Sequence, residues 1–429
     1  MYALRRRLEK VRERFWVLPA LAITAAIAAA VLLPMLDRSV ALPDTLAVGG
    51  QEENARAVLT AIAALAVSVA GVSFSVIVVA LVLAAQQLSP RVLRSFQRQS
   101  MNQAVLAMLL GTATYALFVL ASISERREPV PELSVTVAML LAAASLGLFV
   151  VFLHHAVRSL NASVVIRRIA ADGHNALERP YPQGVGEPAA GADPQERWSG
   201  AARHEVRAPR AGYVSAVDGS KLLRWARAND AFVEQRRAVG SFVVTGVPLA
   251  VVYRQGADDI DCSPVGDAFV IAEERVVEGD IGFPLRQLVD IALKGLSPSV
   301  NDPTTAENAM DSVTDTLARF AQREPVDPLR LDEDGVPRLQ AIAPTLDDLV
   351  RLAFDQVRHD AAGRPPFAVR LLELLADLRT AAPAAARSRE IARQAELITE
   401  QAIGLVEHEA DRQLVAETYG RLHAHEDVA

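Results

Sequence analysis

The sequence predicts a membrane α-helical protein, with four transmembrane helices and a cytoplasmic α+β region. The first observation is a set of four long apolar segments that contain no Asp, Glu, Lys or Arg: Val17–Leu36, Ala57–Ala85, Asn102–Ile123 and Leu133–Leu153. Each reaches or exceeds the roughly 20 residues that a helix needs to cross a hydrocarbon core. The second is that the residues after the fourth segment have the composition of a soluble domain.

Two other interpretations of the apolar segments are weaker. Buried helices of soluble proteins seldom exceed about 14 wholly apolar residues. The first segment is also not expected to be a cleaved signal peptide, because it ends in Leu33-Pro34-Met35-Leu36-Asp37 rather than in small residues, and three further segments follow it.

The flanking arginines predict the orientation, since Lys and Arg collect on the cytoplasmic side of a membrane. Basic residues cluster before the first segment, between the second and third, and after the fourth, whereas the other two loops mix arginines with carboxylates. Both termini are therefore expected in the cytoplasm. Pro90 follows the second segment and starts an expected interfacial helix whose anchors at the lipid headgroups are Arg91, Arg94 and Arg98.

Composition divides the chain into six predicted regions. These are a cytoplasmic N-terminus (1–16), the transmembrane domain (17–156), a helical continuation of the fourth span with a flexible linker (157–203), a β module (204–256), a mixed segment (257–343) and a C-terminal helical region (344–429). The single cysteine, Cys262, excludes an intrachain disulfide and suits a reducing compartment.

Neutral polar groups in the second span are the main functional signal inside the membrane. No ionisable side chain is expected at membrane depth before His154 and His155, which argues against a proton-coupled pump or a carboxylate-based exchanger. Small and hydroxyl residues repeat along one face of the second span, which predicts either a helix-packing face or the lining of a pore or solute path. The residues of this face are Ser68, Gly71 and Ser75.

The β module contains two stretches, 208–214 and 240–249, with the glycines that tight turns between short strands require. These stretches resemble the two halves of a biotinyl or lipoyl carrier domain, which implies a small barrel-sandwich hybrid. Carrier domains present an acceptor lysine on a hairpin, whereas Lys221 lies in a stretch with a helical pattern. We therefore expect the fold without the prosthetic group.

Residues 283–306 carry the most motif-like pattern in the chain. Gly295 is expected to end one helix, and Asp302 to cap the next one, with Pro303 at its first position. A polar cluster at a helix start either caps the helix or binds a small anionic ligand, and both interpretations stay open. The cluster consists of Asn301, Asp302, Thr304 and Thr305.

Motifs in both halves of the chain carry a family resemblance. Residues 88–91 read Leu-Ser-Pro-Arg, and residues 288–292 read Leu-Val-Asp-Ile-Ala. Residues 296–298 read Leu-Ser-Pro, and residues 301–306 read Asn-Asp-Pro-Thr-Thr-Ala. Together they resemble the bacterial membrane-protein family named domain of unknown function 2254, over nearly the whole chain. The resemblance implies a multi-pass protein of the bacterial inner membrane with no established activity. The family has a Gln-Asp pair where this chain has Gly279-Asp280, which leaves open the contact made by that amide.

Catalysis is the least supported class of function. The sequence contains no phosphate-binding loop, dinucleotide fingerprint, nucleophile elbow or paired-carboxylate signature. The histidines lack the spacing of a zinc site, so we expect neither a metal nor a cofactor.

We expect an oligomeric channel or passive solute pathway gated by the cytoplasmic domain, with a membrane-anchored scaffold or sensor as the alternative. The expected partners are membrane lipids and further copies of the chain, with a small anionic ligand at the cytoplasmic domain and no nucleic acid.

Overall fold

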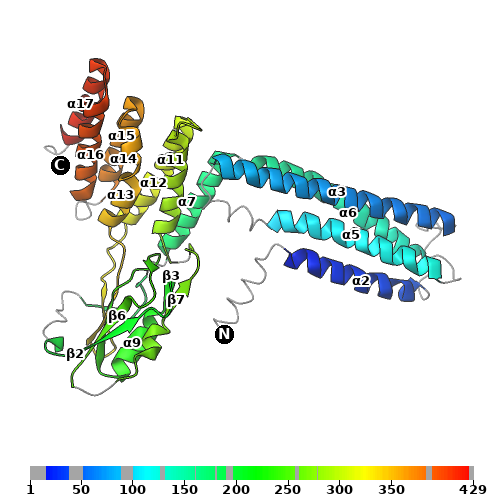
Figure 1. Cartoon of the computed structure of the whole chain (residues 1–429), viewed down its shortest axis with the longest axis horizontal. Coiled ribbons are helices and arrows are strands. Elements are labelled where there is room, and N and C mark those ends of the chain that lie inside the picture. The colour runs from blue at the N-terminus through cyan, green and yellow to red at the C-terminus, as the bar shows by residue number, and fades with distance from the viewer. Residues whose placement is uncertain are drawn as a thin grey trace. The chain divides into compact units, whose positions relative to one another are not determined.

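The computed structural model describes residues 16–37, 52–87, 100–125, 131–159, 161–178, 181–189, 197–256, 260–277, 279–382 and 389–424. Its contacts divide the chain into two compact units, Met1–Val165 (unit 1) and Ile166–Ala429 (unit 2). Figure 1 shows unit 1 as long helices and unit 2 as a mixture of sheet and helices.

Unit 1 contains the four predicted apolar helices. Its described helices are all long and apolar enough to cross a membrane. They are α2 (Val17–Asp37), α3 (Glu52–Gln87), α5 (Ser100–Glu125) and α6 (Glu132–Ser159). The 36 residues of α3 give a helix of about 54 Å, which exceeds a hydrocarbon core of about 30 Å. A helix of this length that crosses a membrane must tilt or extend beyond the lipid.

Helix α5 contacts each of the other three helices through small side chains and hydroxyls. At Gly111 an added Cβ would lie 3.5 Å from the backbone oxygen of Ala22, so α2 and α5 approach closely. A buried hydroxyl pair, Thr112 and Ser145, joins α5 to α6 with an oxygen–oxygen distance of 2.9 Å. Small residues and interhelical hydrogen bonds are the usual means of packing helices in lipid.

The region predicted as a helical continuation of the fourth span is helical, but as a separate helix. Helix α6 ends at Ser159, and a separate helix, α7 (Ala162–Glu178), begins after residues 160–161. The side chain of Asn161 accepts a hydrogen bond from the Ser163 amide at 2.9 Å. Such a side-chain bond satisfies an amide that has no partner within the helix, so it favours a new helix start at this point.

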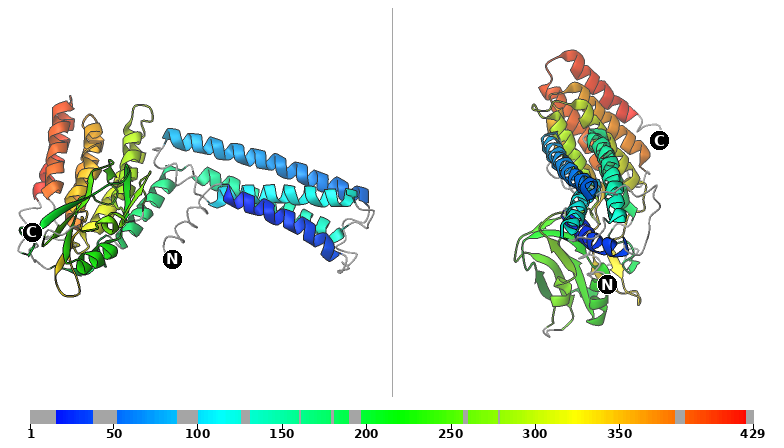
Figure 2. Two further views of the ribbon diagram at one scale, coloured as in Figure 1. Left: turned by 60° about the horizontal axis from the view of Figure 1, so that its bottom comes forward. Right: turned by 90° about the vertical axis from the view of Figure 1, so that its right-hand side faces the viewer.

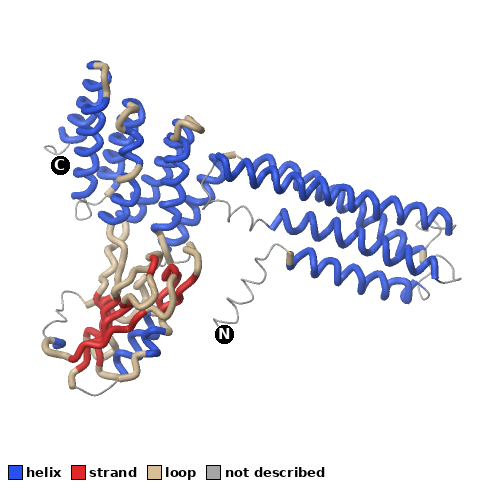
Figure 3. The backbone as a smooth tube through the Cα atoms, viewed as in Figure 1, coloured by secondary structure: helices blue, strands red, loops and turns tan. Residues whose placement is uncertain are grey.

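Unit 2 contains two sheets, drawn in red in Figure 3. The six-stranded sheet has the order β1-β8-β9-β4-β6-β2, and the three-stranded sheet has the order β5-β3-β7. The strands are β1 (Glu187–Pro188), β2 (Ala202–Arg207), β3 (Gly212–Val217), β4 (Ala231–Gln235), β5 (Phe242–Val243), β6 (Pro248–Arg254), β7 (Phe269–Ala272), β8 (Leu329–Leu331) and β9 (Pro337–Gln340).

The strands expected in a separate β module over 204–256 belong to this larger system. Strand β4 pairs with β9 in parallel, and β3 pairs with β7, so residues far beyond 256 complete both sheets. The core between the sheets also includes side chains of α9 (Gly219–Ala228) and α10 (Ser263–Gly266). A carrier-like module of 50 residues is therefore not confirmed, although the stretches 208–214 and 240–249 do form turns and short strands.

The predicted flexible linker is packed where the structure describes it. Val185 and Ala189 are buried, and the buried ring of Trp198 stacks on Phe232 with centroids 6.1 Å apart. The indole nitrogen donates to the backbone oxygen of Pro337 at 3.3 Å. The described Pro and Gly residues of this stretch thus lie in β1 or in turns around it.

Helices after β7 form the second part of unit 2, and the left-hand view of Figure 2 shows them side by side. The buried faces of α13 and α15 match the two apolar stripes expected in the C-terminal region, and Pro365 starts α15. These helices are α11 (Gly282–Leu296), α12 (Pro303–Ala321), α13 (Leu346–Phe354), α14 (Val357–Ala361), α15 (Pro365–Ala381), α16 (Arg389–Leu405) and α17 (Glu409–Ala424).

Candidate functional site

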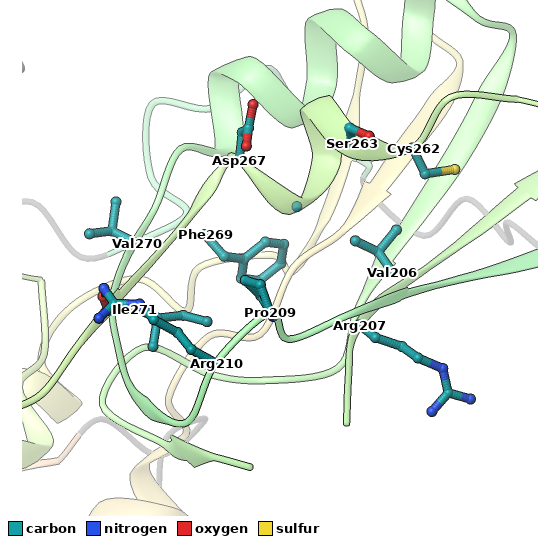
Figure 4. A pocket seen from close by; sticks show the side chains of 11 residues that line it. Val206, Arg207, Pro209, Arg210, Cys262, Ser263, Asp267, Phe269, Val270 and Ile271 are labelled. Carbon is teal, nitrogen blue, oxygen red and sulfur yellow. The ribbon is translucent and has the colours of Figure 1, made fainter. Parts of the chain in front are cut away.

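A groove of about 670 Å³ opens on the surface of unit 2. One wall comes from the end of β2 and the loop that follows it, and the other comes from α10 and β7 (Figure 4). Strands β2 and β7 are edge strands of the two different sheets. The groove therefore lies where both sheets end, and its volume falls in the range of small-molecule sites.

The floor of the groove is apolar. Val206, Phe269 and Ile271 line it and are buried in the core between the sheets. Figure 4 shows the ring of Phe269 beside Pro209 in the middle of the lining. A ligand in this groove would bury apolar surface against rigid strands rather than against a loop.

Charged side chains at the rim are unevenly paired. Arg207 donates to Glu205 and to the backbone oxygen of Gly246, each at 2.7 Å. Arg210 donates to the backbone oxygen of Ile271. Among the described residues no carboxylate lies within ion-pair distance of Arg210. Arg210 is therefore the cation of the rim whose charge is left for a ligand or for solvent.

The groove lining contains one carboxylate, that of Asp267, on the α10 side, and Asp261 lies one residue before the lining residue Cys262. Asp267 is 3.8 Å from the ammonium of Lys221. Asp261 precedes α10, and hydrogen bonds from the hydroxyl and the amide of Ser263 hold the pKa of its carboxyl below the ordinary value. Negative charge is thus confined to the end of the groove at α10.

The β7 wall is connected to α11 by a clamped segment, of which residues 273–277 and 279–281 are described. Arg275 donates two hydrogen bonds to Asp280, at 2.5 and 2.9 Å, and Asp280 is buried. The guanidinium of Arg275 also lies 5.6 Å from the ring centroid of Phe283 in the first turn of α11. Gly240, with φ of 85°, approaches so closely that an added Cβ would lie 2.1 Å from an Asp280 oxygen. The clamp thus holds the start of α11 against the turn before β5.

Helix α11 in turn packs on α7. At Gly173 of α7 an added Cβ would lie 3.5 Å from Pro284 of α11 and 3.4 Å from Thr316 of α12. His174 lies 3.1 Å from a carboxylate oxygen of Asp315 on α12. Helix α7 is therefore part of the packing of unit 2, and only residues 160–161 separate it from the end of α6.

The predicted face of α3 is exposed in unit 1. The hydroxyls of Ser68 and Ser75 donate to the backbone oxygens of Ala64 and Gly71, at 2.8 and 3.0 Å. No described atom lies within 4 Å of a Cβ built on Gly71. Helix α3 packs within its own chain through another face, which includes Ala63, Ala66, Ala70 and Ser73. Pore lining or packing between copies both stay predictions for the exposed face.

The other predicted site residues divide into two groups. Arg91, Arg94 and Arg98 lie outside the described residues. At the α11–α12 junction, the carboxylate of Asp302 accepts hydrogen bonds from the amide and the hydroxyl of Thr305, at 3.1 and 2.6 Å, while Asn301 and Thr304 are exposed. The cap is thus confirmed, and a carboxylate already occupies the position that an external anion would take.

Comparison with known proteins identifies the family. A family model described as "Predicted membrane protein (DUF2254)" matches residues 12–377. The chain belongs to this family. It is 28% identical over 420 residues to the uncharacterized protein MT1328 of Mycobacterium tuberculosis (strain CDC 1551 / Oshkosh), with 95% of this chain and 80% of the relative covered. The uncharacterized protein Mb1321c of Mycobacterium bovis matches with the same identity and coverage. No solved structure matches the chain.

Sequence reasoning missed the groove and the clamp of this DUF2254 protein. Asp280 was noticed only as part of a family pattern, and its partner Arg275 lies five residues earlier without a recognisable motif. The groove joins β2 to β7 across about 60 residues of sequence, so no local pattern marks it. A weak signal was available in the short apolar strand 269–272, which follows the Cys262-Ser263-Pro264 turn.

Lys221 lies in helix α9, as predicted, and its backbone amide donates to the capping residue Asp218. Within the described residues, no group of three or more His, Cys, Asp or Glu side chains has the geometry to hold a metal ion.

Proposed function

We propose that this membrane protein is a sensor: the groove of unit 2 binds a small ligand, and the bound state is transmitted through β7, the Arg275–Asp280 clamp and α11 to α7. The observation that carries the proposal is the direct connection of the groove wall to α11, because a ligand that shifts β7 would displace the clamped segment next to it. Interfaces and packed cores respond to such shifts by changing between discrete arrangements.

The direction of the signal follows from the predicted topology. We place unit 2 in the cytoplasm and the protein in the bacterial inner membrane, on the basis of the arginines that flank the spans. With Cys262 replaced by Ser, Glu53→Cys should react with a membrane-impermeant thiol reagent on intact cells, and Glu396→Cys should react only after lysis. The opposite pattern would place the groove outside the cell.

The transmission can be tested without a known ligand. Cys262 lines the groove and is the only cysteine in the chain, so alkylation with N-ethylmaleimide fills the groove of the full-length protein at one position. We expect altered amide hydrogen exchange in residues 269–284 and also in α7. In Asp280→Asn, the change near β7 should persist and the change in α7 should be lost.

Two controls accompany that experiment. Asp290→Asn disrupts another ion pair of α11, at 3.3 Å from Arg286, without touching the clamp, and should leave the response of α7 intact. Cys262→Ser treated with the reagent should show no response. Unchanged exchange in α7 after complete alkylation would refute transmission along this route.

A passive pathway between copies of the chain is the second candidate, and the exposed face of α3 favours it. Ser68→Leu with Ser75→Leu should block flux in reconstituted vesicles without changing the particle mass if the face lines a pore, or dissociate the particle if the face packs between copies. Val67→Leu with Val78→Leu is the matched control on exposed neighbouring positions of α3. A strictly monomeric particle would exclude this candidate.

A further inference from the structure

The groove has the chemistry of a site for one class of ligand. We infer that it binds an amphipathic anion, with a carboxylate or phosphate head at Arg210 and an apolar body over the floor formed by Pro209, Phe269 and Ile271. This inference rests on the proposed function in one respect, since both assign a ligand to the groove.

The charge of the head group follows from the rim. Arg207 has an ion-pair partner in Glu205 at 2.7 Å, which Arg203 shares at 3.1 Å, whereas Arg210 has only the backbone oxygen of Ile271 as a partner among the described residues. A ligand that covered Arg210 without an anionic group would take water from a guanidinium and offer no charge in return, which costs free energy. An anion instead forms a charge-assisted and often bidentate hydrogen-bonded pair with it.

The carboxylates at the other end limit the charge of the ligand. Asp267 lies 3.8 Å from the ammonium of Lys221, and the carboxylate of Asp261 accepts a hydrogen bond from the Ser263 amide. Neither carboxylate therefore needs a cationic group of the ligand as a partner. A polyanion that extended along the groove would meet the carboxylate of Asp267, which is part of the lining. The arrangement therefore selects a single anionic head at the Arg210 end and an uncharged body toward α10.

The apolar body is supported by the floor and by the surface next to it. Val270 lines the groove and is 40% exposed. It pairs across β7–β3 with Ala216, and Tyr213 of β3 lies between Ala272 and Phe242, with its ring 5.1 Å from that of Phe242. The outward face of the three-stranded sheet thus extends the apolar surface beyond the groove. An acyl or alkyl chain suits such a surface better than a compact polar metabolite does.

The rate of Cys262 alkylation in the full-length protein, held in phosphatidylcholine nanodiscs, reports occupancy of the groove. We expect octanoate and octyl phosphate to slow alkylation at least about tenfold at saturation. Acetate and inorganic phosphate carry only the head, and octanol and octyltrimethylammonium carry only the chain or the wrong charge; these four should protect weakly or not at all. Protection in nanodiscs that contain phosphatidylglycerol, without added ligand, would identify a membrane lipid rather than a soluble anion as the source of the head group.

Variants separate charge from shape. Arg210→Gln should weaken octanoate binding about tenfold or more, because it removes a charged hydrogen-bond donor, whereas Arg203→Gln, on strand β2 and outside the groove lining, should not. Val270→Glu should abolish binding, and Val244→Glu, at a position with 57% exposure outside the groove lining, should not. Each variant is accepted only if its alkylation rate without ligand equals that of the parent chain.

The outcomes distinguish this inference from the proposed function. Equal protection by octanol and octanoate, or unaltered binding by Arg210→Gln, would overturn the anionic ligand. Absence of protection by every probe would overturn it as well. Protection of Cys262 by octanoate with no change of exchange in α7 would leave the ligand class standing and refute the sensor.

Discussion

Units 1 and 2 handle buried polar groups differently. The buried polar side chains among the described helices of unit 1 are all neutral, and include Thr112, Ser134 and Ser145. Unit 2 buries charged ones, including Asp280, Asp332 and Arg338. A charge in lipid finds no water when its partner moves away, so membrane helices avoid charges, whereas a water-exposed unit can retain them as pairs. Among the described residues, buried charged side chains are therefore a feature of unit 2.

The largest expected effect tests the ionic core of unit 2. Asp332 accepts from Arg338 at 2.8 Å, and its side chain is 1% exposed. Asp332→Ala should reduce the free energy of unfolding by about 3 kcal/mol, which is the low end of the range for breaking a buried ion pair. The low end applies because Arg338 still donates a hydrogen bond to Asp230 at 2.6 Å. Urea unfolding followed by tryptophan fluorescence can measure this, since Trp198 lies 5.6 Å from the Arg338 guanidinium. The exposed neighbour Glu333 is the control, and Glu333→Ala should cost less than about 1 kcal/mol.

The same carboxylate predicts an acid dependence in unit 2. Burial raises the pKa of Asp332, but hydrogen bonds from Arg338 and from the amides of Val336 and Asp334 outweigh burial and leave the pKa below its ordinary value. Its contribution to stability is therefore complete above the ordinary value of about 4 and is lost as the pH falls through the lower, folded-state pKa. Thermal unfolding between pH 7 and 3 should become less acid-sensitive in Asp332→Asn. An unchanged acid slope would show that other groups govern it.

An intermediate effect is expected at the partly exposed cap of α12. Asp302→Ala should destabilise unit 2 by about 0.5–2 kcal/mol, because the Thr305 amide loses its acceptor. Asp302→Asn retains a capping oxygen and should lose less. Chemical denaturation measures both variants. A loss as large as that of Asp332→Ala would contradict the ranking of a half-buried carboxylate below a fully buried one.

The smallest effect is expected inside unit 1. The coupling between Thr112 and Ser145 in a double-mutant cycle with Thr112→Val and Ser145→Ala should be about 0.6 kcal/mol, the average for hydrogen bonds between membrane helices. Unfolding in mixed detergent micelles provides the measurement. Thr114, whose hydroxyl bonds to Leu110 of its own helix at 2.8 Å, is the control and should show no coupling to Ser145. A coupling of several kcal/mol would mean that unit 1 relies on polar contacts as unit 2 does.

Local signals in the sequence were sufficient for several elements. Apolar runs longer than 20 residues have few alternatives to a spanning helix, and the four predicted spans correspond to α2, α3, α5 and α6. The Asp302 cap and the Pro303 start were predictable for a similar reason, because a cap depends on residues three apart in sequence. The Asn161 start of α7 carried the same kind of signal and was overlooked.

The sequence by itself therefore determined the spans, the cap, and the helical position of Lys221, since each depends on neighbouring residues and on the solvent. Only the tertiary structure decided which face of α3 packs, how β3 pairs with β7, and that Arg275 clamps Asp280 beside Gly240. These features depend on contacts between segments distant in sequence, whose free energy comes from burial and pairing across the fold. The groove belongs to this second group, because its two walls become neighbours only after both sheets have formed.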